Sequence, residues 1–189
     1  RAIAALDVLG YRTTTSYDRA NRITAVTDPL NHTTTTTYDD AGRAIASRDP
    51  LNHVTTSVYD DANRKVATID ALNFRTTSVY DPASRRIATI DPRTYITTTS
   101  YDKANRPTAV TDAEHHTTTT TYDAAGRHIE TTDANGYRTT LVYDAANRQI
   151  ATINPRGYTT TFQYDAANQK TNEVNAELGV ITLAYDPAG

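Results

Sequence analysis

Two kinds of short β-prone segment alternate along the chain. One kind, as at residues 33–38 (TTTTTY), is rich in threonine and ends in tyrosine, and the other, as at residues 22–27 (RITAVT), mixes β-branched residues with alanine. Clusters of Asp, Asn, Gly and Pro, which favour turns, separate these segments. No segment shows the 3.6-residue period of an amphipathic helix. The pattern predicts a continuous antiparallel meander of β-hairpins.

The hairpin pattern repeats every 21 residues without an insertion, and such a fixed period indicates a repeat architecture. If each repeat is numbered from its tyrosine, position two is always Asp, position four is always Ala and position nineteen is always Thr. The tyrosines are Tyr17, Tyr38, Tyr59, Tyr80, Tyr101, Tyr122, Tyr143, Tyr164 and Tyr185. Position six holds Arg1, Arg22, Arg43, Arg64, Arg85, Arg106, Arg127 and Arg148, with Gln169 as the exception. We expect residues 1–189 to form a single array of nine repeats, as a segment of a longer repeat protein.

The nine tyrosines and the arginines from Arg22 to Arg148 are predicted to form a structural ladder along one edge of the sheet. A four-residue turn after each tyrosine would place it opposite the arginine of its own repeat, and that arginine opposite the next tyrosine. Each guanidinium would then lie between two phenol rings at a strand spacing of about 4.8 Å, where each cation–π contact contributes roughly 0.5 to 1 kcal/mol. The Asp at position two is expected to accept backbone N–H bonds and to offset the arginine charge.

The composition predicts an all-β chain with almost no thick interior. Leu, Ile, Val and Phe together number 31 residues, whereas Thr alone numbers 37, and Thr and Tyr fit half-buried strands. Neither sheet face shows clean apolar alternation. About 18 strands are more than a twisted open sheet usually sustains without curling. We therefore expect the strip to wind into a spiral or tube, similar to a β-solenoid.

Charge and cysteine content narrow the classes of partner. The formal net charge is -3 and no basic cluster appears, so no nucleic-acid partner is expected. No run of about 20 apolar residues is present, so this segment is expected to have no membrane span. The chain has no Cys, which excludes disulfides and thiolate metal sites.

The pattern YDxAxRxxAxxDPxxxxTT, as in residues 38–56, resembles the YD-repeat, or RHS-repeat, family, and the resemblance covers the whole chain. It implies a long β-strip of the kind that forms hollow shells around cytotoxic domains in RHS toxins and insecticidal toxin complexes, and the barrel of teneurins. It also implies an extracellular or cell-surface location. Family shells end in an aspartyl autoprotease segment, which nothing here matches. The strict period suits an open helical polymer or uniform tube better than a closed shell.

The polar residues do not form the pattern of an active site. Positions two and twelve hold 16 of the 22 acids and fall at opposite ends of the strands, so they do not pair as in glycoside hydrolases. The doublets Asp39-Asp40 and Asp60-Asp61 are expected to cap turns, and the spacing of a calcium loop is missing. The histidines at position sixteen would lie about 9.6 Å apart, too far to share one zinc ion; they are His32, His53 and His116. No enzyme activity, metal or cofactor is expected.

Two sets of residues are candidates for glycan contacts. Aromatic residues at position sixteen are suited either to stacking on sugars or to packing at the sheet edge, and they are Tyr11, Phe74, Tyr95, Tyr137 and Tyr158. The threonine runs and one sequon are candidates for glycosylation, although unmodified strand threonines are the simpler interpretation. These residues are Asn31, Thr33, Thr34, Thr35, Thr36, Thr37, Thr117, Thr118, Thr119, Thr120 and Thr121.

The sequence predicts a non-catalytic structural repeat protein that forms part of an extracellular or cell-surface fibre, tube or wall. Two alternatives are a section of the hollow shell that encapsulates a toxin, and a carbohydrate-binding surface adhesion module. The expected partners are neighbouring repeats of the same long chain, other copies in a filament, and glycans.

Overall fold

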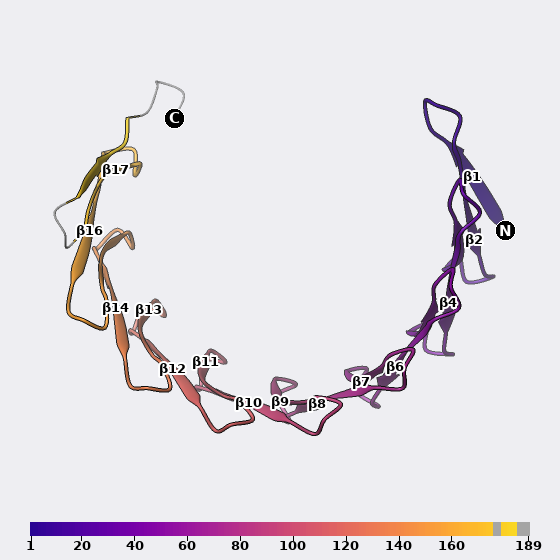
Figure 1. The fold of residues 1–189 in the computed structure, drawn as a ribbon, viewed down its shortest axis with the longest axis horizontal. Coiled ribbons are helices and arrows are strands. Elements are labelled where there is room, and N and C mark those ends of the chain that lie inside the picture. Colours follow the sequence, from indigo (N-terminus) through magenta and orange to yellow (C-terminus); the bar gives the residue numbers. More distant parts are fainter. Residues whose placement is uncertain (176–178, 185–189) are drawn as a thin grey trace. The chain divides into compact units, whose positions relative to one another are not determined.

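The computed structural model describes residues 1–175 and 179–184, and every regular element among them is a β-strand. No helix in this part of the chain has the length and apolar character that a membrane span requires. The chain divides into two compact units, Arg1–Ile96 and Thr97–Gly189. Within each unit, successive strands pair antiparallel to form a meander (Figure 1). The predicted all-β chain of hairpins is confirmed.

The strands are five or six residues long, except for a three-residue strand at the end. The first unit contains β1 (Ala2–Leu6), β2 (Arg12–Tyr17), β3 (Ile23–Thr27), β4 (Thr33–Tyr38), β5 (Ala44–Arg48), β6 (Val54–Tyr59), β7 (Lys65–Ile69), β8 (Arg75–Tyr80) and β9 (Arg86–Ile90). The boundary between the units falls at the start of β10 (Ile96–Tyr101). The second unit continues with β11 (Pro107–Thr111), β12 (Thr117–Tyr122), β13 (His128–Thr132), β14 (Arg138–Tyr143), β15 (Gln149–Ile153), β16 (Thr159–Tyr164), β17 (Lys170–Val174) and β18 (Val180–Thr182).

The two turns of a repeat share one backbone conformation. In the turn after β4, the N–H of Asp39 donates to the carbonyl of Arg43 and the N–H of Gly42 donates to the carbonyl of Asp39, both at 3.0 Å. The fourth turn residue is left-handed, with φ of 82° at Gly42 and 70° at Asn52 in the turn after β5. Gly and Asn tolerate this conformation at low cost. This requirement explains why Asn or Gly recurs just before the arginine.

The hairpin register differs from the one expected for a four-residue turn. Each turn has five residues, so the arginine is its last residue and Tyr38 pairs with Ala44. Thr37 pairs with Ala46, which leaves Ile45 as the extra residue of a β-bulge. The same shift recurs beside Tyr17, Tyr59, Tyr80, Tyr101, Tyr122, Tyr143 and Tyr164. A bulge of this kind increases the local twist of the strand.

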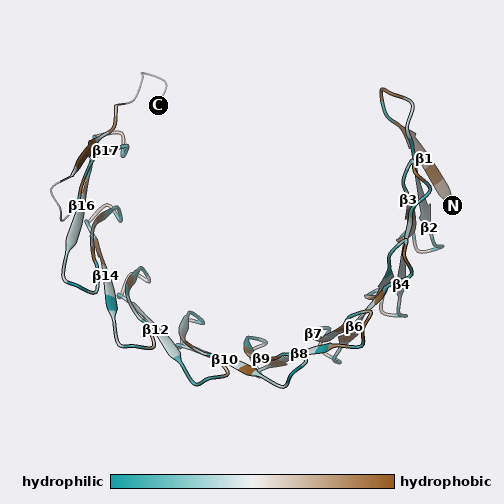
Figure 2. Cartoon of the chain, in the orientation of Figure 1, coloured by the Kyte–Doolittle hydropathy of each residue, from teal (hydrophilic) through white to brown (hydrophobic). Residues whose placement is uncertain are grey.

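Each unit is a single layer without a thick core. Among the described residues, the only buried hydrophobic side chains are Ala67, 2% exposed, and Ala151, 8% exposed, and no polar residue is buried. Both alanines occupy position nine and pair with a threonine at position nineteen, as Ala67 does with Thr77. Figure 2 shows hydrophobic and hydrophilic segments interspersed along the strands. The scarcity of bulky aliphatic residues therefore matches a sheet that has little interior to fill.

Candidate functional site

A chain of polar contacts follows the sheet edge that carries the turn between Tyr and Arg. It starts with the Asp at position two, which closes the turn. In the turn after β4, one carboxylate oxygen of Asp39 accepts the backbone N–H of Arg43 at 2.8 Å, and the other accepts Nε of the same arginine at 2.6 Å. Because both oxygens have a partner, the position requires a carboxylate. The same ion pair joins Asp18 to Arg22, Asp60 to Arg64, Asp81 to Arg85, Asp102 to Arg106, Asp123 to Arg127 and Asp144 to Arg148.

These contacts stabilise the charged form of each aspartate. The hydrogen bond from the backbone N–H of Arg43 lowers the pKa of Asp39 below its ordinary value; the arginine side chain lowers it further, whereas desolvation opposes the shift. Hydrogen bonds that favour the carboxylate have this effect in general. The pKa is lowered from the same leading cause in Asp18, Asp60, Asp81, Asp102, Asp123 and Asp144.

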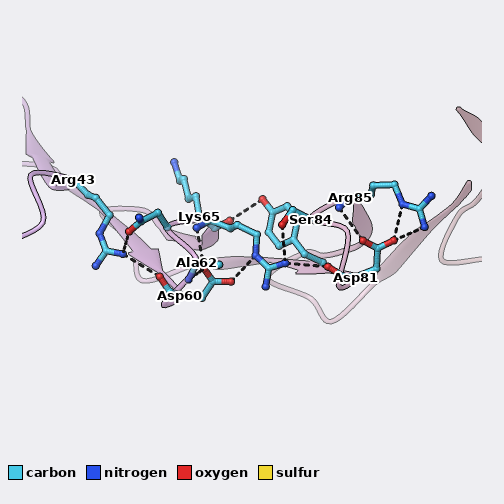
Figure 3. A network of polar contacts seen from close by, with 10 residues as sticks. Arg43, Asp60, Ala62, Lys65, Asp81, Ser84 and Arg85 are labelled. Carbon is cyan, nitrogen blue, oxygen red and sulfur yellow. Dashed lines mark hydrogen bonds and ion pairs between the residues drawn. The ribbon is translucent and has the colours of Figure 1, made fainter. Parts of the chain in front are cut away.

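The arginine then reaches forward into the next repeat. Nη1 of Arg43 donates to the carbonyl of Asp60 at 3.0 Å and to the side chain of Asn63 at 2.9 Å (Figure 3). Its guanidinium lies 5.0 Å from the ring centroid of Tyr59. This distance is within the range of a cation–π contact. In the second unit, Arg127 makes the same contacts with the repeat that follows it.

The tyrosine hydroxyl forms a hydrogen bond with the preceding repeat. Tyr38 donates its O–H to the carbonyl of Ile23 at 2.8 Å, fifteen residues earlier in the chain. Tyr122 donates to the carbonyl of Pro107 at 3.0 Å in the second unit. Tyr59, Tyr80 and Tyr164 make the same bond, and in each case the acceptor is the residue at position seven of the preceding repeat. Each boundary between these repeats is thus held by an arginine that reaches forward and a tyrosine that reaches back.

The sequence predicts that each arginine lies between two tyrosines, but the observed contacts are one-sided. Each cation–π contact between an arginine and a tyrosine joins the arginine to the tyrosine of the following repeat, whereas the tyrosine of its own repeat pairs with position seven. The contacts join Arg1 to Tyr17, Arg22 to Tyr38, Arg43 to Tyr59, Arg64 to Tyr80, Arg106 to Tyr122, Arg127 to Tyr143 and Arg148 to Tyr164. Tyr101 lies at the end of β10, and Tyr185 lies outside the described residues.

The opposite sheet edge carries the turns that begin at position twelve. There the side-chain oxygen of Asp49 accepts the backbone N–H groups of Leu51 and His53, at 2.9 and 2.8 Å. Asn154 fills the same role, so this position needs only one acceptor oxygen. Where position sixteen is His, the second oxygen of Asp contacts Nδ1 of the ring, at 3.1 Å for His32, 2.8 Å for His53 and 3.2 Å for His116. Among the described residues, no three His, Asp or Glu side chains are grouped to hold a metal.

The candidate glycan contacts lie on exposed or half-exposed surface. The aromatic residues at position sixteen are between 54% and 59% exposed, namely Tyr11, Phe74, Tyr95, Tyr137 and Tyr158. Asn31 is the exposed left-handed residue of its turn, with φ of 65°. The two threonine runs form most of β4 and β12. In each run the first hydroxyl is hydrogen-bonded across the turn, as between Thr27 and Thr33 at 2.8 Å.

Comparisons with known proteins agree with this architecture. The RHS Repeat family model matches residues 38–75, 75–117, 101–138, 122–158 and 143–177, which together span most of the chain. A comparison with curated protein sequences finds no match. Among solved structures, TcdB2-TccC3 without its hypervariable C-terminal region is similar with a TM-score of 0.78 and 14% identity, over 94% of this chain. A Tc holotoxin pore of Photorhabdus luminescens is similar with a TM-score of 0.66 and 14% identity, over 92% of this chain. In both cases the match covers 11% of the other chain, and identities this low show the fold alone.

Proposed function

Because the chain belongs to the RHS repeat family, we propose that it is a non-catalytic wall segment of a larger, exported RHS-repeat assembly. In this role the chain contributes a strip of sheet, and its partners are neighbouring repeats of the same long protein. The extracellular or cell-surface location is part of the proposal, and it rests on the family.

The contact that each arginine makes with the following repeat is the observation that carries the proposal. It joins Asp39, Arg43 and Tyr59 in the first unit and recurs through Asp123, Arg127 and Tyr143 in the second. Repeats that interact mainly with their neighbours add stability one unit at a time, so the array can be extended without a central core. A wall needs this property, whereas an enzyme needs a single pocket with unique groups.

The fold similarity to TcdB2-TccC3 and to a Tc holotoxin pore favours one kind of wall. We infer that the strip forms part of a hollow shell around a toxin cargo. A second candidate is an open fibre or tube, because the 21-residue period has no insertion in nine repeats. A closed shell must change curvature somewhere, whereas a strict repeat generates one constant geometry.

Negative-stain electron microscopy of the native, full-length protein separates the two candidates. Discrete hollow particles are the expected result for a shell, and filaments of uniform width would support the fibre instead. A small monomeric particle without a cavity or polymer would contradict the wall role. Protease treatment of intact producing cells tests the location, because an exported protein is digested while a cytoplasmic control protein survives.

A further inference from the structure

Four exposed leucines form a row along the sheet edge that carries the turns beginning at position twelve. They occupy position fourteen of successive turns in the first unit, and between 73% and 77% of each is exposed; they are Leu9, Leu30, Leu51 and Leu72. The residue before each leucine is also apolar, namely Val8, Pro29, Pro50 and Ala71. We call these eight residues the leucine edge. A row of exposed apolar side chains, unlike scattered single ones, indicates an interaction surface.

The four leucines have the same place in their turns. The backbone N–H of Leu51 donates to the carboxylate of Asp49 at 2.9 Å, and the equivalent bond recurs at Leu9, Leu30 and Leu72. Successive turns on this edge lie two strands apart, so the leucines are spaced by about 9.6 Å. A proline precedes each of the two central leucines and fixes its own φ. The tips are therefore ordered before any partner binds, which lowers the entropic cost of association.

A hollow of about 290 Å³ lies between the third and fourth of these turns. Its lining includes the apolar side chains of Val54, Ile69 and Ala71, and polar groups of the two turns and of β6 complete it. The hollow is large enough to take one more leucine side chain. The leucine edge thus carries protruding apolar groups and a gap that fits such a group, which makes it complementary to itself.

Burial of the turn after β5 leaves none of its backbone donors without a partner. The side chain of Asp49 accepts the N–H groups of Leu51 and His53, and Asn52 donates its N–H to the carbonyl of Asp49 at 3.0 Å. The N–H of Asp49 donates to the carbonyl of His53, and Pro50 has no N–H. A buried donor without a partner would be costly. Water can therefore leave the tip of this turn without that cost.

Charged groups of both signs lie behind the tips. Each of the four turns begins with an aspartate, and three adjoining strand ends carry an arginine. The aspartates are Asp7, Asp28, Asp49 and Asp70, and the arginines are Arg12, Arg48 and Arg75. Asp28 and Asp49 also contact His32 and His53. An apolar centre with such groups around it is the usual composition of a protein–protein interface.

We propose that the leucine edge pairs with the leucine edge of a second copy of this chain. A partner must offer apolar groups at the same spacing along four turns, and an identical edge has that spacing. A two-fold axis near the middle of the row sets the leucines of each copy into the gaps of the other, which is an isologous contact. The opposite edge of the sheet has the same spacing, but it presents ion pairs such as that of Asp39 with Arg43. Those groups would lose water against leucine without compensation.

This pairing joins two strips side by side, whereas the proposed wall role joins repeats along one strip. It therefore adds a second copy as a partner and does not depend on whether the strip forms a shell or a fibre. The row is also limited in length, because position fourteen is charged in the next two turns, at Arg93 and Glu114.

Sedimentation equilibrium of the intact chain over a range of concentrations tests the pairing. A reversible equilibrium between monomer and dimer is expected. Leu30→Gln and Leu51→Gln should each weaken the dimer by at least about tenfold, because each change removes apolar surface from both copies. Ile23→Gln is the matched control: Ile23 is 42% exposed but begins β3 at the opposite edge of the sheet, so the affinity of its dimer should be unchanged.

An introduced cysteine identifies the edge that meets its copy, since the chain has no Cys of its own. A residue beside the two-fold axis faces the same residue of the other copy. Under mild oxidation, Leu30→Cys or Leu51→Cys should therefore give a disulfide-linked dimer on a non-reducing gel, and Ile23→Cys should not.

Two results would overturn the proposal. A chain that stays monomeric at all concentrations would leave the leucine edge to a different apolar partner. A dimer that Leu30→Gln and Leu51→Gln weaken no more than Ile23→Gln does would use another surface. Circular dichroism of each variant verifies that the sheet remains folded. Neither result bears on whether the full-length protein forms hollow particles or filaments, so failure of the pairing is distinct from failure of the wall role.

Discussion

The contact between Arg22 and Tyr38 provides a direct test of how one repeat stabilises the next. The guanidinium lies 4.6 Å from the ring centroid, and the tyrosine hydroxyl donates to the carbonyl of Ile23 at 2.8 Å. Tyr38→Phe removes the hydroxyl bond alone, whereas Tyr38→Leu also removes the aromatic ring. Arg22→Gln removes the cation and introduces the residue that position six already has at Gln169.

The expected losses follow from the two kinds of contact. A hydrogen bond contributes about 0.5 to 1.5 kcal/mol, and the half-exposed site of Tyr38 places Tyr38→Phe near the lower end of this range. A cation–π contact adds roughly 0.5 to 1 kcal/mol. Tyr38→Leu should therefore reduce the free energy of unfolding by about 1 to 2 kcal/mol. The double mutant with Arg22→Gln should reveal a coupling energy of about 0.5 to 1 kcal/mol.

Urea unfolding followed by circular dichroism measures the free energies, and amide hydrogen exchange locates the effect. A loss of 1 to 2 kcal/mol corresponds to an opening equilibrium roughly 5 to 30 times larger, so amides of β3 and β4 should exchange faster by that factor. Tyr95→Phe is the control, because Tyr95 is 56% exposed at the opposite edge; its change should stay within about 0.5 kcal/mol. A coupling energy of zero, or a control as costly as Tyr38→Phe, would refute the reasoning.

Three further changes probe the turns. The pKa of Asp39 is lowered by folding, so its stabilising effect is complete above the ordinary pKa of about 4 and is lost as the pH falls below it. Urea unfolding at a series of acidic pH values should show this loss of stability. Asp39→Asn should make the dependence of the unfolding free energy on pH shallower in that range. Gly42 has φ of 82°, so Gly42→Ala should lower the free energy of unfolding in urea by about 1 to 2 kcal/mol. Gly42→Asn should lower it much less, because Asn tolerates the left-handed conformation. Equal losses in the two variants would contradict a requirement for that conformation. Gln169→Arg creates an ion pair with Asp165 and should raise stability by about 0.5 kcal/mol, and an unchanged urea midpoint would count against that pair.

The sequence predicts most of the fold because its period and its turn residues agree. The Asp at position two acts as expected, since Asp39 accepts both the backbone N–H and the side chain of Arg43. The register was not predictable from alternation alone. It depends on the left-handed residue at Gly42 and on the bulge at Ile45, which lengthen the turn and shift the pairing by one residue.

The one-way contact from each arginine to the following tyrosine affects how such a gene can change its length. The described boundaries at which an arginine contacts the following tyrosine share one geometry, so duplication or loss of one 21-residue unit there joins an arginine to an equivalent tyrosine. A change of any other length would displace the bulge and move side chains to the wrong face of the sheet. Unequal recombination between repeats of equal length therefore yields proteins that can still fold, and arrays of this kind can lengthen or shorten in whole units over evolutionary time.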